Sequence, residues 1–216
     1  SGPEMTQNFQ DGNFLTKGQN IVSGSWQPKA LFACERVALN IMQHLSGIAT
    51  QTYFYKQKLW NKNIILLDSR KTIPNLRVMQ KYAVKTGGGE NHRLNLSDGI
   101  LIKDNHIKVA GGVRSALRDI KKNSQYFKVK IEVECDNLLQ VQECLEFDVD
   151  VIMLDNMTIK QMQEAIKLIN KRVKIEVSGG VNIENIEQIS TLDIDYISIG
   201  ALTHSVKACD IGLDIL

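Results

Sequence analysis

The chain has 216 residues, of which 43% are hydrophobic and 23% are charged, which is typical of a globular protein with one substantial core. A formal net charge of +2 argues against a general nucleic-acid-binding protein, whose basic residues would dominate one face. No apolar run approaches the roughly 20 residues that cross a bilayer, and the polar start does not resemble a signal peptide. The four cysteines lack metal-ligand spacing, so we expect a cytoplasmic protein in a reducing compartment.

The first predicted element is a helix that begins at Pro28. Apolar residues recur in it at the three- and four-residue steps of one helix face: Leu31, Cys34, Ala38, Ile41 and Leu45. The other side of this helix carries Arg36. We expect a break at Ser46–Gly47 and then a second helical stretch that runs to about Trp60.

Beyond residue 60, short apolar runs rich in Ile and Val alternate with amphipathic stretches. The predicted strands are Ile64–Asp68, Gly99–Lys103, Val129–Glu134, Val149–Asp155, Val173–Ser178, Tyr196–Ile199 and, as a seventh candidate, Ile211–Leu216. The predicted helices between them are Leu76–Lys85, Val113–Lys122, Leu138–Glu146, Ile159–Ile169 and Ile183–Ser190. Repeated strand-helix units of this kind require right-handed crossovers and a parallel sheet covered by helices.

Such units either close into a barrel or form an open doubly wound sheet, and periodicity alone does not decide between the two. The polar residues favour the barrel. Six of them fall at or just beyond the carboxyl end of a predicted strand: Asp68, Lys103, Glu134, Asp155, Ser178 and Gly200. In a barrel these ends meet at one rim, where active sites of this architecture lie. We therefore predict a parallel α/β barrel of six to seven strands, either closed or incomplete.

A local group of cations follows the first predicted strand. Between Arg70 and Lys103 the sequence has seven Lys or Arg residues and only two acids. Lys81 and Lys85 are expected on a solvated helix face. The others at strand ends or in loops, with one histidine, are predicted to bind an anion: Arg70, Lys71, His92, Arg93 and Lys103. Arg pairs with planar carboxylates and Lys serves phosphates as a point charge, so the mixture suggests a ligand with both groups.

Carboxylates end the neighbouring strands. Alternation places Glu132 and Glu134 on one face of their strand, and the inside of a closed barrel does not solvate that face cheaply. These acids and Asp155 are expected to have cationic, metal or ligand partners. The alternative is an outward-facing strand edge, or an ion pair with a nearby lysine such as Lys130 or Lys174.

Two glycine-bearing turns, Ser178–Gly180 and Gly200–His204, follow the last two well-predicted strands. Late strand-to-helix loops with free backbone N–H groups often hold a phosphate in barrels. Either turn alone would be read as a tight connection. Their occurrence in adjacent units predicts a phosphate site.

In order along the chain, from about Asp11 to the C-terminus, these stretches and their neighbours resemble the motifs of quinolinate phosphoribosyltransferases. The matching stretches are Glu35–Asn40, Ser46–Thr50, Ser69–Thr72, Lys81–Tyr82, Gly87–Gly88, Asn91–Arg93, Lys103–His106, Glu132–Glu134, Leu154–Asn156, Ser178–Gly180 and Gly200–Thr203. The resemblance implies phosphoribosyl transfer from 5-phosphoribosyl 1-pyrophosphate to quinolinate. Pyrophosphate and CO2 leave, Mg²⁺ accompanies the pyrophosphate, and the product is nicotinate mononucleotide, a precursor of NAD.

The resemblance also implies a role for each site residue. Those that would hold the two quinolinate carboxylates are Arg70, His92, Arg93 and Lys103, joined by Arg36 from the partner subunit of a homodimer or of a higher oligomer of dimers. The implied catalytic residues are Lys71, Lys103, Glu134 and Asp155. The two carboxylates among them would hold Mg²⁺ through water or pyrophosphate. The residues that would bind the 5-phosphate are Ser178, Gly179, Gly180, Gly200, Ala201 and His204.

The sequence also departs from the family pattern. Ile73 and Asn75 stand where Thr and Gly are usual, and Val177 stands where Ala is usual, which affects fine geometry more than reaction class. Most of the family's separate N-terminal domain is missing, so we expect residues 1–60 to be a remnant of it with connecting helices, and residues 61–216 to be the catalytic barrel. Two alternatives stay open: a related phosphoribosyltransferase for another pyridine or aromatic acid, and a non-catalytic phosphate- or nucleotide-binding protein.

Overall fold

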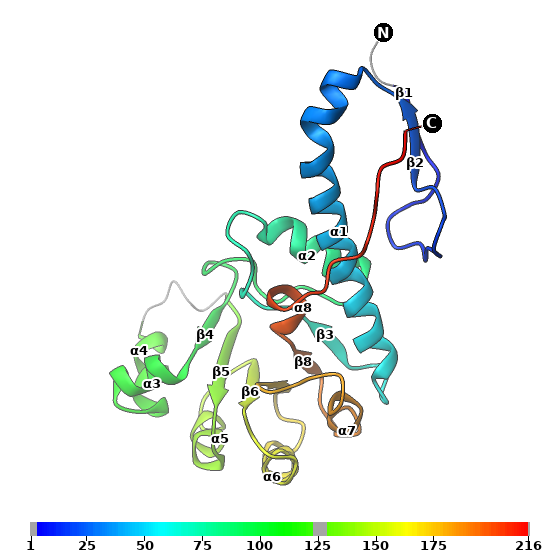
Figure 1. Ribbon diagram of the computed structural model, residues 1–216. Helices are drawn as coiled ribbons and strands as arrows, with labels where there is room; N and C mark the ends of the chain where they lie inside the picture. The colour runs from blue at the N-terminus through cyan, green and yellow to red at the C-terminus, as the bar shows by residue number, and fades with distance from the viewer. Residues whose placement is uncertain (1–3, 123–128, 216) are drawn as a thin grey trace.

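The computed structural model describes residues 4–122 and 129–215, and Figure 1 shows a body built around a sheet with an arm that projects from it. The arm is the first half of helix α1 (Pro28–Lys58), with a hairpin of β1 (Glu4–Gln7) and β2 (Val22–Ser25) near it. The end of the chain returns along this helix, where the backbone N–H of Cys209 donates to the carbonyl oxygen of Gln43 at 3.0 Å.

The body contains six parallel strands in the order β3-β8-β7-β6-β5-β4. Their bounds are β3 (Ile65–Leu67), β4 (Ile100–Ile102), β5 (Ile131–Cys135), β6 (Val151–Asp155), β7 (Lys174–Ser178) and β8 (Tyr196–Ser198). This confirms the predicted α/β fold and its parallel sheet. The order is the one that neighbouring strands follow around a barrel, but no hydrogen-bonded pairing joins β3 to β4 within the described ranges, so the sheet itself is open at that point.

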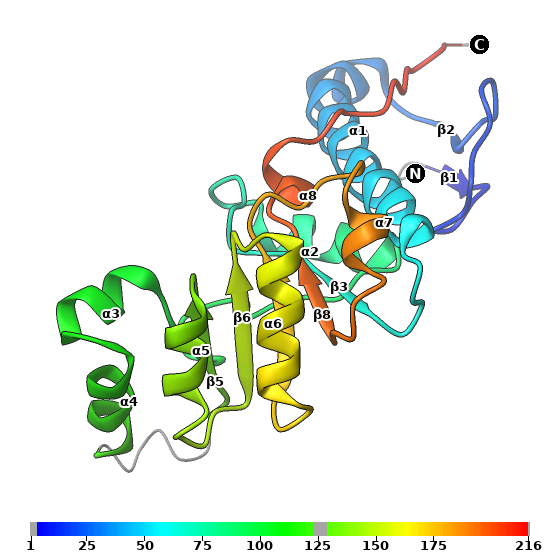
Figure 2. The same ribbon diagram turned by 90° about the horizontal axis from the view of Figure 1, so that it is seen from below.

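Seven helices of the described chain connect or follow these strands: α2 (Arg77–Thr86), α3 (Asp104–Ala110), α4 (Val113–Lys121), α5 (Leu138–Cys144), α6 (Ile159–Ile169), α7 (Ile186–Ile189) and α8 (Ala201–His204). In Figures 1 and 2, α5, α6 and α7 lie in a row outside the sheet. The core lies between these helices and the outward side chains of the strands, such as Ile152, Val177 and Ile197, which are fully buried. Helix α6 begins at a capping box in which Thr158 and Gln161 satisfy each other's backbone N–H groups.

The predicted break at Ser46–Gly47 is wrong, because α1 is continuous from Pro28 to Lys58. Gly47 is buried, and a Cβ atom there would overlap the carbonyl oxygen of Lys207 and lie 3.0 Å from Cγ1 of Val206. The glycine therefore allows the returning chain to cross α1 closely. The sequence alone does not tell whether such a glycine breaks a helix or allows another backbone to approach it closely.

The seventh predicted strand, Ile211–Leu216, is also wrong in the part that the structure describes, since residues 211–215 form no strand. Leu216 lies outside the described residues. Strand β8 already has β3 and β7 on its two sides, so no adjacent edge is left for another strand. The segment instead packs along α1, where Gln43 Nε2 donates to the carbonyl oxygen of Ile211 at 2.7 Å. Within the described ranges, no helix combines the length and the apolar character needed to span a membrane.

Candidate functional site

The carboxyl ends of the six strands bring the predicted polar residues to one rim of the sheet. In spatial order these residues are Asp68, Gly200, Ser178, Asp155, Glu134 and Lys103. The strand register explains why the acids face the same side. Glu134 is paired with Met153, which is paired with Glu176, and Asp155 is paired with Ser178. Paired residues share a face, so these side chains line the side of the sheet opposite the outer helices.

Arg70 and Arg93 are near enough at this rim for their charges to interact. Nη1 of Arg93 donates to the carbonyl oxygen of Gly99 at 2.9 Å. Burial lowers the pKa of Arg93 and the positive charge of Arg70 lowers it further, while the carboxylates of Glu132 and Asp98 oppose these changes. No carboxylate of the described chain lies within ion-pair distance of either arginine, and the Arg70 side chain makes no hydrogen bond there. The arrangement would be stabilised by a bound anion, and paired guanidinium groups are suited to carboxylates.

The ends of β4, β5 and β6 place Lys103, Glu134 and Asp155 side by side. Nζ of Lys103 lies 3.4 Å from Oε2 of Glu134. Burial raises the pKa of Glu134, Lys103 opposes that change, and the negative charge of Asp155 adds to it. Two neighbouring carboxylates, both partly exposed, offer the hard oxygen ligands that Mg²⁺ prefers, so the donor set fits the predicted metal.

The turn after β7 has a backbone that only glycine adopts easily. Gly179 and Gly180 have φ angles of 80° and 65°. A Cβ atom on Gly179 would lie 2.7 Å from the backbone nitrogen of Asn156, in the turn after β6. The two turns therefore pack closely, and a side chain at residue 179 would separate them.

The turn after β8 meets the loop after β3. A Cβ atom on Gly200 would lie 2.8 Å from Cδ of Lys71 and 3.2 Å from the ring of His204. The hydroxyl of Thr203 donates to the carbonyl oxygen of Lys71 at 2.8 Å and joins α8 to that loop. Lys71 is exposed and forms no ion pair with any described residue. Gly200, Ala201 and His204 thus lie beside a free lysine, as expected for a phosphate site.

The prediction that Lys81 lies on a solvated helix face is wrong. The side chain is 2% exposed and forms an ion pair with Asp68, which is fully buried. Nζ of Lys81 also donates to the carbonyl oxygen of His92 at 2.9 Å, and the N–H of His92 donates to Oδ1 of Asp68 at 2.9 Å. Burial raises the pKa of Asp68, against the opposing effect of Lys81. By contrast, Lys85 is exposed, as predicted.

A second buried cluster joins His92, Glu132 and Glu176. Nε2 of His92 lies 3.1 Å from Oε2 of Glu132 and 3.7 Å from Oε2 of Glu176. We expected a cationic, metal or ligand partner for Glu132, and the structure provides the His92 side chain rather than Lys130 or Lys174. Burial alone lowers the pKa of His92, but the two carboxylates outweigh it and raise the pKa. Burial, together with the charge of Glu132, raises the pKa of Glu176 to about 8.

Glu176 was missed at the level of sequence. The signal was present, because alternation in Lys174–Ser178 places Glu176 on the same strand face as Ser178. Its distance from the strand end made it look like part of the core. In the structure, Glu176 lies on the same face of β7 as Ser178, so the polar residues of the rim extend further down this face of the sheet.

Arg36 is the one predicted site residue that this chain does not bring to the rim. It is exposed on the arm and makes no hydrogen bond or ion pair with the rest of the described chain. It lies eleven residues before Gly47, which corresponds to about 16 Å along the helix. A role in the site of its own chain is not supported by this position.

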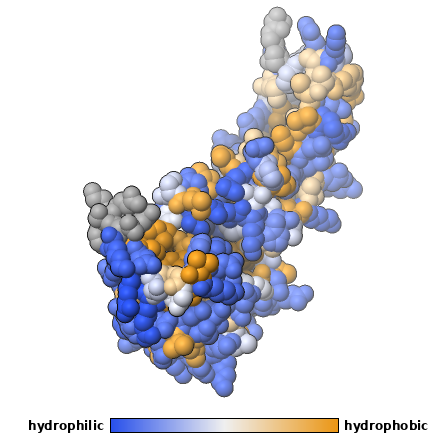
Figure 3. All heavy atoms as spheres, turned by 90° about the vertical axis from the view of Figure 1, so that its left-hand side faces the viewer, coloured by the Kyte–Doolittle hydropathy of each residue, from blue (hydrophilic) through white to orange (hydrophobic). Residues whose placement is uncertain are grey.

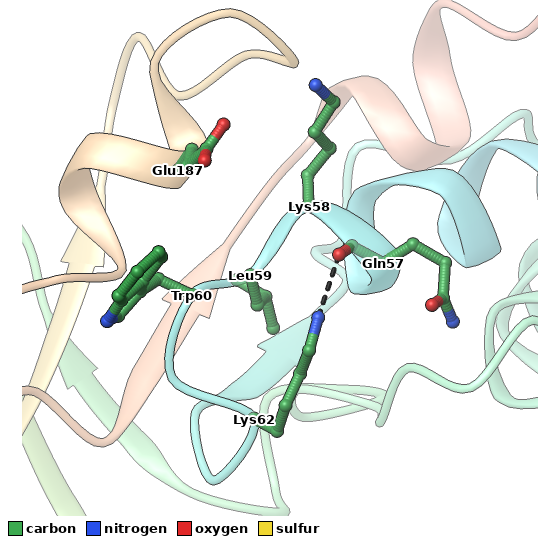
Figure 4. Close-up of a pocket in the computed structure, with 6 residues that line it drawn as sticks. All are labelled: Gln57, Lys58, Leu59, Trp60, Lys62 and Glu187. Carbon is green, nitrogen blue, oxygen red and sulfur yellow. Dashed lines mark hydrogen bonds between the residues drawn. The ribbon is translucent and has the colours of Figure 1, made fainter.

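Figure 4 shows a hollow that contains none of the predicted site residues. It is lined by Gln57, Lys58, Leu59, Trp60, Lys62 and Glu187. These residues precede β3 and β8, so the hollow lies at the amino end of the sheet. Nζ of Lys62 donates to the carbonyl oxygen of Gln57 at 2.7 Å, which links the loop before β3 to the last turn of α1. We place the site at the opposite end, where the cations and carboxylates converge.

Fold and site together define a parallel α/β protein with cationic and acidic side chains gathered at the carboxyl ends of its strands. The chain belongs to the quinolinate phosphoribosyltransferase family. The sequence profile described as "Quinolinate phosphoribosyl transferase, C-terminal domain" matches residues 48–214, which confirms the resemblance seen in the motifs.

Curated relatives and solved structures agree with this assignment. A probable nicotinate-nucleotide pyrophosphorylase (carboxylating) of Methanocaldococcus jannaschii is 46% identical over 206 residues, covering 91% of this chain and 72% of the relative. The crystal structure of nicotinate-nucleotide pyrophosphorylase from Ehrlichia chaffeensis matches with a TM-score of 0.94 and 42% identity, over 99% of this chain and 77% of that one. NadC from Streptococcus pyogenes matches with a TM-score of 0.90 and 44% identity, over 96% and 73% of the two chains.

Proposed function

We propose that this protein transfers the phosphoribosyl group of 5-phosphoribosyl 1-pyrophosphate to quinolinate and decarboxylates the product to nicotinate mononucleotide. Beside the family membership, one observation carries the proposal. The charges of Arg70 and Arg93 interact, neither arginine forms an ion pair with a carboxylate of the described residues, and Lys103 stands at the same rim. A planar ligand with two carboxylates would neutralise this set, whereas a ligand with one carboxylate would leave part of it unpaired.

The chemistry needs one bond to form and one to break at C1 of the ribose. The ring nitrogen of quinolinate attacks C1, and the bond from C1 to the pyrophosphate oxygen breaks. Positive charge develops on the ribose as pyrophosphate leaves, and Glu134 and Asp155 are the carboxylates placed to stabilise it. The bond from ring carbon C2 to its carboxylate carbon then breaks, CO2 leaves, and C2 takes a proton from water in its place. Positioning and the surrounding cations would favour this step without a dedicated acid.

The same two carboxylates are our candidates for holding Mg²⁺, through water or through pyrophosphate. When bound, the ion would neutralise charge on the leaving pyrophosphate. Lys71 would supply a further point charge to the same end of the ribosyl substrate. Its lack of an ion pair within the described ranges supports that role.

The 5-phosphate is proposed to bind between the turns after β7 and β8. Gly179 and Gly180 have positive φ angles, and Gly200 is close to Lys71 and His204. Backbone N–H groups in such turns, together with a nearby cation, are a common phosphate site in α/β barrels. Ser178 and Ala201 begin and continue these turns and complete the proposed set.

We further propose that the working form is a homodimer, or an oligomer of dimers, in which Arg36 enters the site of the partner subunit. The exposed position of Arg36 on the projecting arm supports this assignment. The cytoplasmic location stays a prediction from the sequence.

The proposal is tested by incubating the protein with 5-phosphoribosyl 1-pyrophosphate, Mg²⁺ and either quinolinate or nicotinate. We expect nicotinate mononucleotide and CO2 from quinolinate. Chromatography detects the nucleotide, and trapping of labelled CO2 detects the decarboxylation. Turnover of nicotinate in place of quinolinate would assign a related phosphoribosyltransferase. Binding of the ribosyl substrate without turnover of either acid would assign the non-catalytic alternative.

A further inference from the structure

Helix α8 is joined to the loop after β3 by a buried hydroxyl that the proposed site does not use. Strand β8 pairs with β3, so α8 and that loop begin next to each other (Figure 1). Thr203 on α8 is 1% exposed, and its hydroxyl donates to the carbonyl oxygen of Lys71 at 2.8 Å. The same hydroxyl lies 3.2 Å from the carbonyl oxygen of Gly200. One side chain therefore links two residues that we assign to the phosphates of the ribosyl substrate.

A second side chain, Gln80 of α2, supports this link and is fully buried. Its Oε1 accepts from the backbone N–H of Ile73 at 2.8 Å, and its Nε2 donates to the carbonyl oxygen of Thr203 at 3.0 Å. A backbone N–H can only donate and a carbonyl oxygen can only accept, so these two partners fix the orientation of the amide. Nε2 of Gln80 also lies 2.7 Å from Nε2 of His44 on α1. Each polar atom of the amide is thus engaged, and α2 holds both α8 and the loop after β3.

Lys71 is held by its backbone and is free at its charge. Its carbonyl oxygen is bonded to Thr203, and its backbone N–H donates to Oγ of Ser69 at 3.1 Å. The aliphatic stem lies against Gly200, because a Cβ atom there would be 2.8 Å from Cδ of Lys71. The side chain is exposed and forms no ion pair with the residues that the structure describes. Lysine loses much side-chain entropy when it binds a ligand, and an anchored backbone and stem reduce that loss.

The neighbouring cation Arg70 is held by different bonds. Nη2 of Arg77 donates to the carbonyl oxygen of Arg70 at 3.4 Å, and Nε of Arg77 donates to Oγ1 of Thr72 at 3.0 Å. Neither bond involves Thr203. Loss of the Thr203 hydroxyl would therefore release Lys71 and leave Arg70 in place.

We propose that Thr203 is a positioning residue that holds Lys71 against the turn after β8 and so fixes the point charge that faces the phosphates of the ribosyl substrate. The inference rests on the proposed function, and it gives a role to a residue that we do not place in contact with either substrate. Gln80 contributes by holding Thr203 and Ile73 together. The role predicts an effect on the ribosyl substrate that is not shared by quinolinate.

Two substitutions at residue 203 test this role. Thr203→Val keeps the shape of the side chain and removes the hydroxyl, whereas Thr203→Ser keeps the hydroxyl. We expect Thr203→Val to raise the KM for 5-phosphoribosyl 1-pyrophosphate by about fivefold or more, as for the loss of one buried hydrogen bond. The KM for quinolinate should change little, and Thr203→Ser should restore most of the affinity for the ribosyl substrate.

Thr191→Val is the matched control. The exposed Thr191 hydroxyl donates to the carbonyl oxygen of Gln188, three residues earlier, at 2.7 Å, just as Thr203 bonds Gly200 within its own turn. The control therefore removes the same local bond without releasing the loop after β3, and both KM values should stay unchanged.

A double-mutant cycle with Lys71→Ala gives the second measurement. If Thr203 acts through Lys71, Thr203→Val adds little to the loss caused by Lys71→Ala. Additive losses, an equal rise in both KM values, or equal affinity of Thr203→Val and Thr203→Ser for the ribosyl substrate would overturn the proposal. If Thr203→Val does not fold, Gln80→Met removes the supporting link and should give the same selective rise.

Turnover by the unaltered protein reports separately on the proposed function. Crystal structures of Thr203→Val and Thr203→Ser show the position of Lys71 relative to Gly200 even without turnover. We expect Lys71 to move away from Gly200 in Thr203→Val alone, and an unchanged position there would count against the inference.

Discussion

At the scale of single residues, the site depends on which charges the protein leaves without partners. Lys81 and Arg70 carry the same charge and are close in the sequence, but Lys81 is buried against Asp68, whereas Arg70 forms no ion pair with any residue that the structure describes. A buried charge that has a partner maintains structure, while an unpaired charge at a rim is available to a ligand. Burial lowers the pKa of Arg93, the positive charge of Arg70 lowers it further, and a bound dianion would oppose the effect of Arg70.

The first prediction concerns these two arginines. Replacing Arg70 or Arg93 by Ala should weaken quinolinate binding by roughly 2 to 5 kcal/mol, because a desolvated carboxylate would lose its partner. Binding of 5-phosphoribosyl 1-pyrophosphate should change far less. Calorimetric titration with each ligand measures both effects, and Arg118→Ala, exposed on α4, is the matched control. Equal losses for the two ligands would show that the carboxylate and phosphate sites are not divided as we propose.

The second prediction concerns pH. The folded protein raises the pKa of Glu176 to about 8 from an ordinary value of 4.5, so between these values the folded state binds a proton that the unfolded chain has released. The free energy of unfolding should therefore fall as pH rises through this window, by at most about 1.4 kcal/mol per pH unit for one proton. Glu176→Gln keeps the neutral form at every pH.

Urea unfolding between pH 5.5 and 8 tests this expectation. The stability of the unaltered protein should decline more steeply with pH than that of Glu176→Gln. Asp68 and Glu134 also have raised pKa values and act in the same direction in both proteins. Because Glu176 contributes to the raised pKa of His92, the difference between the two curves reports on Glu176 and His92 together. Parallel curves would mean that Glu176 is ionised in the folded protein throughout this range.

Residue types and strand ends in the sequence were sufficient to predict the rim, but not the partner of each charge. Asp68, Glu134 and Asp155 are where alternation and strand position place them. The burial of Lys81 depends on its contacts with Asp68, 13 residues earlier, and with the carbonyl oxygen of His92, 11 residues later, both of which lie outside its own helix. No local pattern distinguishes this lysine from the exposed Lys85.

At the scale of elements, the strands position the site and the glycines set how closely the connections approach. Gly179 allows the turns after β6 and β7 to pack together, and Gly200 gives room to Lys71. Gly47 does the same for α1 and the returning chain. At each of these glycines, the close approach depends on the absence of a Cβ atom rather than on the flexibility of the glycine backbone.

The third prediction tests this at Gly47. Ala is favoured over Gly inside a helix by about 1 kcal/mol, so an exposed Gly→Ala change would stabilise α1. At residue 47 the methyl group would overlap the carbonyl oxygen of Lys207, and overpacking of this kind costs about 1 to 3 kcal/mol. We therefore expect Gly47→Ala to lower the melting temperature, with Asn40→Ala, exposed on the same helix, as the control. An increase in melting temperature would show that the returning chain is not held against α1.

The fourth prediction concerns the two turns assigned to the 5-phosphate. A crystal soaked with phosphate or sulfate should show an anion between Ser178–Gly180 and Gly200–His204, bound by backbone N–H groups. Gly179→Ala should remove that anion, since the residue has a φ angle of 80° and faces the backbone of Asn156. Density only beside Arg70 and His92 would overturn the proposed division of the site.

Helices and strands with a regular spacing of apolar residues could be predicted from the sequence. Those whose conformation depends on contacts with distant parts of the chain could not. Helix α6 has the predicted bounds, and all six main strands are present. Ile211–Leu216 has a strand-like composition but meets no free sheet edge, so it packs on α1 instead. Helix α3 was missed because its seven residues are too short for a reliable period and coincide with a stretch that we read as a loop.

At the scale of the whole molecule, the arm is the feature that a single chain does not explain. Helix α1 carries exposed apolar residues along its first half, including Phe32, Val37 and Met42. Figure 3 shows apolar surface continuing from the body along the projecting arm. Contiguous exposed apolar surface is typical of an interface, and the exposed Arg36 is on the same half of α1 as Phe32 and Val37, which supports the proposed dimer.

The fifth prediction is complementation between subunits. Arg36→Ala and Lys103→Ala chains should each be inactive alone. When mixed, some dimers would contain one site with neither change, so part of the activity should return. Mass spectrometry of differently labelled chains confirms that subunits exchange. Exchange without any recovery of activity would mean that Arg36 acts within its own subunit or has no role.

The strand order also has a consequence for how the chain folds as it is synthesised. Among the described strands, β3 has only β8 as a hydrogen-bonded neighbour, although β3 is the first strand of the sheet to leave the ribosome and β8 is the last. Chains emerge at about 5 to 20 residues per second, so several seconds pass between the synthesis of β3 and that of β8. During that interval Asp68 and Lys81 can already meet, since β3 and α2 are adjacent in sequence. The buried ion pair beneath the site is therefore available before the sheet is complete, as an early local fold that holds β3 ready for its late partner.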